Sequence, residues 1–205
     1  MRLAVATLAL GLAVAGAAHA EPRALSGFSR VTASAGARVE VTIGEFAVDV
    51  SGRDAQRIIT RVSNGTLIVE PVRNIGFSWG RREALVQVSM PQIEGLDASS
   101  GASINGQGVG ATDIALAASS GAELVVAGEC TSFSADASSG ANIRAAGLRC
   151  ERGRVEVSSG ASVHVFASGR LDVEASSGGD VVAHGNPGIG EIDLSSGGSL
   201  RRASQ

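Results

Sequence analysis

The chain has 205 residues, of which 44% are hydrophobic and only 3% are aromatic. Twenty acidic side chains against 17 basic ones give a net charge of −3 at pH 7, which argues against nucleic acid as a partner, because binding to phosphates requires a basic surface. A chain of this length can bury a core. With so few aromatic side chains, we expect that core to consist of small and β-branched residues.

The first 20 residues are typical of a secretory signal peptide. One arginine precedes a run of small apolar residues, and Ala18-His19-Ala20 has the small-x-small pattern of a signal peptidase site. The run is too short to favour a membrane span, and no later segment approaches 18 apolar residues. We therefore predict an exported mature chain that begins at Glu21, lacks a transmembrane segment, and resides in the periplasm, at the cell surface or outside the cell.

Residues 21–95 favour longer strands than the rest of the chain. The segments RVEVTI, IITRV, TLIVEPV and ALVQVSMP alternate between apolar and polar residues, and Asn64-Gly65 between two of them is a hairpin signal. We interpret this part as the first rungs of a solenoid and its cap, because an uncapped terminal rung exposes an unpaired sheet edge.

Residues 96–205 contain a repeat based on Ser-Ser-Gly. Its steps are 20, 19, 20, 18 and 19 residues, too short for two helices per repeat, which indicates a solenoid of strands. The first serines of the copies are Ser99, Ser119, Ser138, Ser158, Ser176 and Ser195. We predict that each copy is a corner between two short strands, and that a second glycine in each rung marks another corner.

Columns of equivalent residues around these serines support a half-buried strand before each corner. The residues one and three positions before the first serine are apolar, which gives the two-residue period of a strand with one buried face. The residue between them is acidic in five of six copies: Asp97, Ala117, Asp136, Glu156, Glu174 and Asp193. The sequence therefore predicts an all-β, single-stranded parallel β-helix with rungs of about 20 residues, continuous over residues 21–205.

The two cysteines occupy one column of this repeat. Cys130 and Cys150 each stand eight residues before the first serine of the next corner. Neighbouring rungs would bring them within disulfide range, and an exported protein favours oxidation. We therefore predict a Cys130–Cys150 disulfide, with two reduced buried thiols as the alternative.

Recognition residues are expected in a glycine-flanked segment before the repeats. Phe77 and Trp79, followed by Arg81 and Arg82, are residue types that anchor protein and sugar contacts. The alternative is an apolar plug over the end of the solenoid. The same segment, Gly76-Phe-Ser-Trp-Gly80, matches a nucleophile elbow, but the alternating residues that follow favour a strand rather than the helix that this motif requires.

Other candidate chemistry is weaker. The acidic column could bind calcium, although a solvated charged face is the simpler interpretation. His164 and His184 stand at different offsets from their serine pairs and are interpreted as surface residues rather than zinc ligands. We expect no cofactor.

The order of these motifs resembles the head GIN domain family, whose members are described as autotransporter adhesins. The resemblance rests on LSGFSRVTASAGARVEVTIG, SNGTLIVEP, VSMPQIEGLDASSGASI and the SSGA repeats. It implies an exported bacterial protein with a right-handed parallel β-helix, and it carries over no catalytic residue.

Our leading functional hypothesis is a non-enzymatic cell-envelope module that binds an envelope protein or polysaccharide, or associates with itself. Regular corners of serine and glycine build a flat ladder rather than a deep pocket, which favours binding over catalysis. The alternative is a polysaccharide-active enzyme on a β-helix scaffold, which requires paired acids with shifted pKa values.

Overall fold

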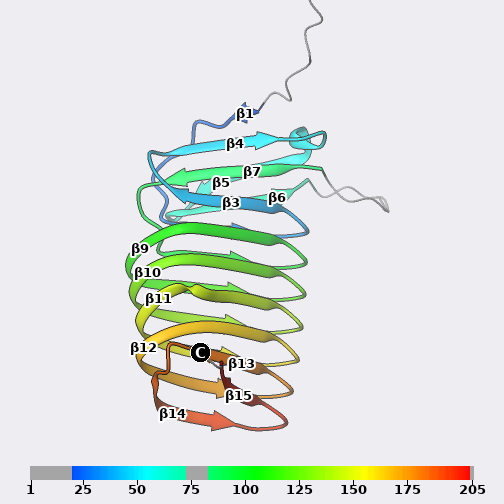
Figure 1. The fold of residues 1–205 in the computed structure, drawn as a ribbon. Coiled ribbons are helices and arrows are strands. Elements are labelled where there is room, and N and C mark those ends of the chain that lie inside the picture. The colour runs from blue at the N-terminus through cyan, green and yellow to red at the C-terminus, as the bar shows by residue number, and fades with distance from the viewer. Residues whose placement is uncertain (1–19, 73–82, 204–205) are drawn as a thin grey trace, which may run out of the picture.

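The structure, a computed structural model, describes residues 20–72 and 83–203. The predicted signal peptide lies outside these residues, apart from Ala20, and stays a prediction. The described chain forms one sheet of 15 strands that is wound into a solenoid (Figure 1), with a single 3-10 turn, η1, at Ala55–Arg57. This architecture confirms the all-β parallel solenoid. Within the described part of the chain, no helix is long and apolar enough to cross a membrane.

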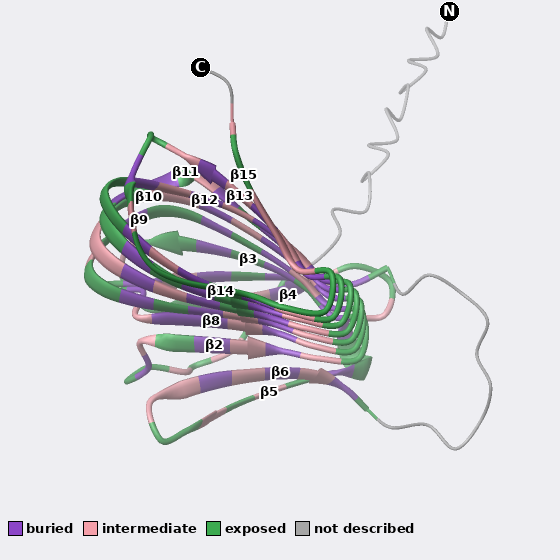
Figure 2. Cartoon of the chain, turned by 90° about the horizontal axis from the view of Figure 1, so that it is seen from below, coloured by how far each residue is buried: buried purple, intermediate pink, exposed green. Residues whose placement is uncertain are grey.

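The regular rungs pair in parallel, each with the next one along the chain. Asp136, for example, lies opposite Glu156, and Cys130 lies opposite Cys150. Viewed along the axis, the strands diverge from the stacked corners, and buried residues alternate with more exposed ones along them (Figure 2). The strands of this region are β8 (Gly95–Ala98), β9 (Ser103–Ala118), β10 (Glu123–Ala137), β11 (Asn142–Val157), β12 (Ser162–Ala175), β13 (Asp180–His184), β14 (Gly188–Leu194) and β15 (Ser199–Arg202).

The second glycine of each rung marks a bend rather than the predicted second corner. Strands β9 to β12 each run from one corner to the next and pass through this position with shifts of register, as between Val126 and Gly128. A β-bulge bends a strand without ending it, which explains why a separate turn is unnecessary. Only the last regular rung breaks here, between β13 and β14.

Each Ser-Ser-Gly is a tight turn in which two residues adopt positive φ. At the first regular corner Ser100 has φ 51° and Gly101 has φ 72°, and the Ala102 N–H donates to the Ser99 carbonyl at 3.1 Å. Positive φ at both central residues is the pattern of a type I′ turn. Successive corners are also joined, because the Gly101 N–H donates to the Ser120 carbonyl at 3.0 Å.

A seventh corner precedes the six that the repeat reveals. Strands β2 (Arg30–Ala33) and β3 (Arg38–Ile43) flank Ser34-Ala-Gly-Ala37, where Ala35 and Gly36 have φ 53° and 77°. Strand β2 pairs in parallel with β8, and β3 pairs in parallel with β9. This corner therefore stacks directly on the Ser99 corner although 65 residues separate them in the sequence.

The residues between those two corners build the rung above them and the cap. Strands β6 (Thr66–Pro71) and β7 (Leu85–Met90) add to the free edges of β2 and β3 in parallel. Strand β5 (Ile58–Ser63) then pairs antiparallel with β6 through the predicted Asn64-Gly65 hairpin. Strands β4 (Ala47–Ser51) and β1 (Glu21–Pro22) extend the β7 edge antiparallel. The solenoid order thus differs from the chain order.

The core consists of stacked apolar columns. The column three residues before the corner serine is fully buried at Leu116, and the column five residues after that serine is fully buried at Leu124. No polar or charged side chain of the described residues is buried. The Cys130–Cys150 disulfide joins β10 to β11 across a Cα–Cα distance of 4.5 Å, as predicted.

Candidate functional site

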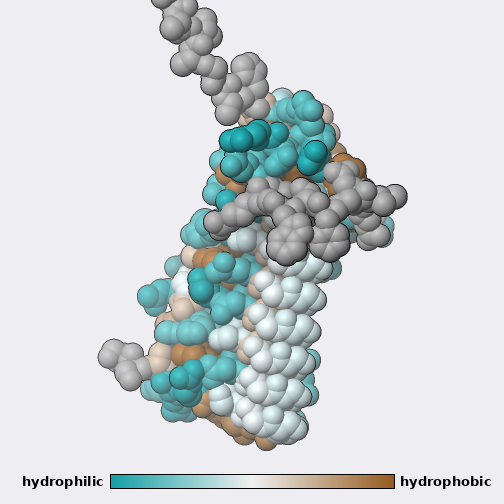
Figure 3. Space-filling view, turned by 90° about the vertical axis from the view of Figure 1, so that its right-hand side faces the viewer, coloured by the Kyte–Doolittle hydropathy of each residue, from teal (hydrophilic) through white to brown (hydrophobic). Residues whose placement is uncertain are grey.

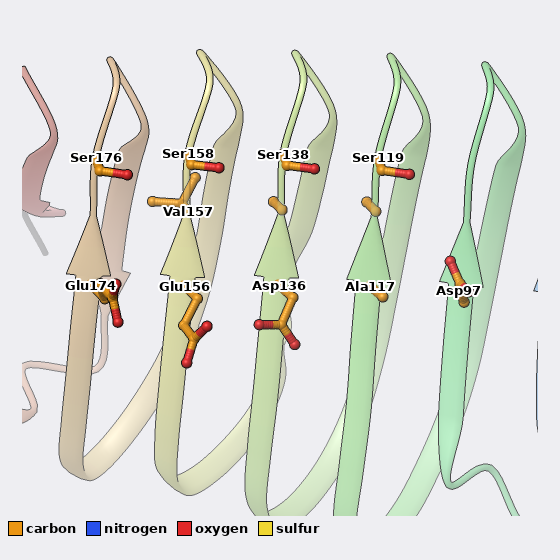
Figure 4. Close-up of a pocket in the computed structure, with 12 residues that line it drawn as sticks. Asp97, Ala117, Ser119, Asp136, Ser138, Glu156, Val157, Ser158, Glu174 and Ser176 are labelled. Atoms are coloured by element: carbon orange, nitrogen blue, oxygen red, sulfur yellow. The ribbon is translucent and has the colours of Figure 1, made fainter. Parts of the chain in front are cut away.

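The acidic column lies on the outer face of the strands that precede the corners. Alternation along each strand sends its neighbours into the core and leaves these carboxylates outside. Together with the first serines of the corners they line a groove of about 420 Å³, which we call the acidic groove (Figure 4). Its principal residues are Asp97, Ala117, Ser119, Asp136, Ser138, Glu156, Ser158, Glu174 and Ser176.

The upper half of the acidic groove holds two carboxylates that make no direct contact with a cationic side chain of the described residues. Within the described residues, neither Asp97 nor Asp136 has a hydrogen bond or salt bridge from its side chain. Burial raises the pKa of Asp97 above its ordinary value. Burial also raises the pKa of Asp136, the Glu156 charge raises it further, and Arg154 opposes both effects. Between these two acids, Ala117 leaves a rung with no carboxylate.

The lower half is electrostatically compensated. The Arg154 Nε donates to the Glu156 carboxylate at 2.8 Å, and the Arg154 Nη2 lies 3.8 Å from the Glu174 carboxylate. One guanidinium therefore bridges two rungs. A cationic or hydrogen-bond-donating partner would consequently find its strongest unsatisfied acceptors near Asp97 and Asp136.

A second groove, of about 620 Å³, continues the same outer face toward the cap. We call it the polar groove. Its residues include Arg30, Gln92, Glu94, Thr112, Asp113, Ser132 and Ser134. Glu94 accepts hydrogen bonds from the Ser29 hydroxyl at 2.6 Å and from the Gln92 amide at 3.1 Å, and Ser132 donates to Asp113. Sequence reasoning missed this groove because its residues come from several positions of the repeat and from the segment before it.

The corners themselves form an uninterrupted ridge beside the acidic groove. Figure 3 shows them as a column of nearly neutral hydropathy along the molecule. This ridge contains the six predicted corner serines. At four of them, Ser119, Ser138, Ser158 and Ser176, the serine lines the acidic groove. The corner motif is therefore both a structural element and one wall of the candidate site.

The predicted recognition residues lie outside the described residues. Phe77, Trp79, Arg81 and Arg82 all belong to residues 73–82, as does Ser78 of the elbow-like motif. This segment stands in the sequence between β6 and β7, where other rungs have a four-residue corner. The role of these residues stays a prediction.

Two aspartates outside the acidic groove are engaged in structural contacts. Asp172 is held by Arg170 at 2.8 Å and by the Glu191 N–H at 2.7 Å, and these hydrogen bonds lower its pKa. Asp180 is likewise held by Arg201, which lowers its pKa. Within the described residues, no group of three or more His, Cys, Asp or Glu side chains is arranged to hold a metal ion.

The two histidines lie together, although their offsets had suggested separate positions. The ring centroids of His164 and His184 are 6.1 Å apart. Both side chains face outward on the strands that follow the corners, away from the acidic groove.

Stacked corners, a parallel sheet and an open acidic face define a β-solenoid with an extended surface rather than an enclosed pocket. The family model described as "Putative auto-transporter adhesin, head GIN domain" matches residues 27–187. The chain therefore belongs to the head GIN domain family.

Solved structures share this fold at low sequence identity. A crystal structure of a "putative adhesin" from Bacteroides fragilis matches with a TM-score of 0.67 and 14% identity, covering 90% of this chain and 95% of that one. A "putative lipid binding protein" from Parabacteroides distasonis matches with a TM-score of 0.52 and 15% identity, covering 93% and 98%. A "putative adhesin" from Parabacteroides merdae gives 0.50 and 12%, covering 93% and 98%. No curated protein matches this chain.

Proposed function

We propose that this protein is an exported, non-enzymatic module of the cell envelope that binds a partner along the acidic groove. The observation that carries the proposal is the row of outward carboxylates and serine hydroxyls, one pair per rung at most levels, with Asp97 and Asp136 unpaired. Its adhesin-like character is supported by the family to which the chain belongs. Residence in the periplasm or at the cell surface belongs to the same proposal.

The spacing of the groove suits an extended partner. Adjacent rungs repeat at roughly 4.8 Å, so a linear molecule that runs along the axis meets similar groups at every level. Several weak contacts on one partner add to a useful affinity when they are linked. Hydroxyl, amide and ammonium donors are the groups that these acceptors would bind, and they occur on polysaccharides and on extended peptides.

A binding array with the purified mature chain tests this proposal. The array carries envelope glycans, envelope proteins and liposomes, the last because one structural neighbour is named as lipid binding. We expect retention of a glycan or protein that weakens as salt concentration rises. The double variant Asp97→Asn/Asp136→Asn should lose this retention, whereas Glu129→Gln, an exposed change outside the groove, should keep it. Equal retention by wild type and double variant would contradict the assignment of the groove.

A polysaccharide-active enzyme is the second candidate, and one observation favours it. Asp136 has a raised pKa and lies opposite Glu156 on the next strand. Neighbouring strands are about 4.8 Å apart, and the carboxyl groups of retaining glycosidases are about 5–5.5 Å apart. Incubation of the same glycans with the protein distinguishes the two functions: new reducing ends that disappear in Asp136→Asn would establish hydrolysis in place of simple binding.

A further inference from the structure

The outer face that follows the corners carries two imidazoles on adjacent strands. His164 on β12 lies opposite Val182 on β13, and His184 lies opposite Phe166. The two histidines are therefore diagonal neighbours on one face of the sheet. Their ring centroids are 6.1 Å apart, and the ring planes are inclined by 33°. Both side chains are half-buried.

This separation fits two imidazoles that share one metal ion. A metal–nitrogen bond is about 2.0–2.1 Å long and a ring nitrogen lies about 1.2 Å from its centroid, so the centroids can be up to roughly 6.4 Å apart. The observed 6.1 Å lies within that limit. That limit corresponds to a linear nitrogen–metal–nitrogen angle, so the two rings must turn toward each other to reach the smaller angles of a tetragonal Cu(II) site.

One ring nitrogen of the pair lacks a hydrogen-bond partner in the described part of the chain. The Nε2 atom of His184 is hidden from solvent and has no hydrogen-bond partner among the described residues. Buried polar atoms in folded proteins almost always have a partner. A shared metal ion would supply one.

The charges around the pair do not oppose a cation as strongly as the sequence suggests. Arg144 lies opposite His164 on one side, and Arg201 lies opposite Val182 on the other. Each guanidinium is bound to a carboxylate: Arg144 to Glu123 at 2.6 Å and Arg201 to Asp180 at 2.5 Å. Both positive charges are therefore partly compensated.

The surroundings of His164 act on its pKa. Burial lowers its pKa, and the neighbouring His184 lowers it further. Arg144 and Arg201 act in the same direction, and Asp180 opposes them. A neutral imidazole is the ligating form, and a lowered pKa favours that form.

We propose that His164 and His184 together bind one divalent transition-metal ion whose remaining coordination positions are filled by water. Imidazole ligands and the usual order of affinities favour Cu(II) first, with Zn(II) and Ni(II) weaker. No third acidic, thiol or imidazole ligand among the described residues completes the set. The site is thus open, and it is separate from the acidic groove on the opposite side of the corners.

Titration of the untagged mature chain with Cu(II) tests the site, because a histidine tag would mask it. We expect one bound Cu(II) per chain, with an electron paramagnetic resonance signal that shows nitrogen coupling from two imidazoles. His164→Gln and His184→Gln should each abolish this two-nitrogen signal, and the double variant, which keeps neither imidazole, should bind more weakly than either single one. Glu129→Gln, on the exposed surface elsewhere, should titrate like the wild type.

A gain of affinity provides an independent readout. Val182→His would place a third imidazole opposite His164 and two residues before His184, and we expect tighter Cu(II) binding than in the wild type. All variants should melt at the wild-type temperature without metal. The proposal is overturned if the wild type shows no saturable binding up to about 1 mM Cu(II). It is equally overturned if the two-nitrogen signal survives in the double glutamine variant.

Discussion

The two ends of the solenoid cover their terminal rungs in different ways. At the N-terminal end, β4 pairs antiparallel with β7 and β5 pairs antiparallel with β6. Val48, Val50 and Ile58 are buried beneath or within this cap. At the C-terminal end, β14 and β15 carry no further strand among the described residues, and Ile192 and Leu194 are 50% and 43% exposed. The same apolar columns are therefore fully enclosed at one end and half open at the other.

A charged residue in an inward-facing column partly protects the open end. Arg202 occupies the column that holds Val165 and Ala183 in earlier rungs. Its guanidinium contacts the Asn186 side chain at 3.5 Å and the Pro187 carbonyl at 3.4 Å. Charges at such positions discourage pairing with another strand. A cap can thus be a covering hairpin or a single charged side chain, and the two give very different burial.

The largest predicted effect tests whether column position or burial determines stability. Leu116 and Ile192 share a column, but Leu116 is fully buried and Ile192 is half exposed. Leu116→Ala should lower the free energy of unfolding by about 2–5 kcal/mol. Ile192→Ala should cost about 1 kcal/mol or less, because half of its surface already faces water. Urea unfolding followed by circular dichroism measures both, and equal losses would mean that the C-terminal rung is covered in solution.

The disulfide tests whether the two ends unfold as one unit. Cys130 and Cys150 close a loop across a sequence separation of 20 residues near the middle of the solenoid. Reduction should lower stability by about 3 kcal/mol in the chain-entropy model. A single shifted transition in calorimetry is expected. Two separate transitions after reduction would show that the capped and open halves fold independently.

The regular part of this architecture was predictable, because it follows from a local pattern repeated in register. The apolar columns and the shared column of Cys130 and Cys150 required only counting. The seventh corner was not found, because Ala35 replaces the second serine and the following rung in space is not the next in sequence. Both edges of β2 offer the same backbone groups, and local sequence does not specify which one β6 or β8 will use.

The candidate sites also divide into features that the sequence predicts and features that only the fold reveals. The acidic column was evident from spacing, whereas its union with the serine row into a groove required the fold. The offsets of His164 and His184 from their serines are six and eight. The even difference keeps both on one face, and it was this diagonal relation that the comparison of offsets overlooked.

A pH comparison should give opposite signs for two aspartates in different parts of the molecule. The folded pKa of Asp136 is raised, so its stabilising contribution is present at low pH and is lost as pH rises through that pKa. Asp136→Asn should therefore melt at or slightly above the wild-type temperature at pH 7. The folded pKa of Asp180 is lowered, so its contribution is present at neutral pH and is lost as pH falls through that pKa.

Thermal melting of both variants between pH 7 and pH 3 checks these signs. Asp180→Asn should melt below the wild type at pH 7, and this difference should shrink as Asp180 of the wild type becomes protonated. The higher melting temperature of Asp136→Asn should also approach that of the wild type on acidification, because Asp136 of the wild type then becomes neutral. Two variants that shift in the same direction would show that the acidic groove is compensated in solution by a group that the described residues do not provide.

The smallest effect distinguishes the turns of the two regions. The cap hairpin uses Asn64 at φ 49°, whereas the regular corner at Ser138 uses Ser139 at φ 53°. Asparagine tolerates the left-handed conformation better than serine. Ser139→Asn should therefore raise stability by a few tenths of a kcal/mol, provided that the larger side chain fits the stack. Gly140→Ala, at φ 70°, should lower it by about 1 kcal/mol or more.

These two variants separate backbone preference from stacking. The space around a Cβ at Gly140 is open, so the penalty of Gly140→Ala would come from its positive φ and not from a clash. A loss of stability in Ser139→Asn would mean instead that close packing between successive corners outweighs the turn preference. Serine would then be preferred because its smaller side chain fits between its neighbours on adjacent rungs.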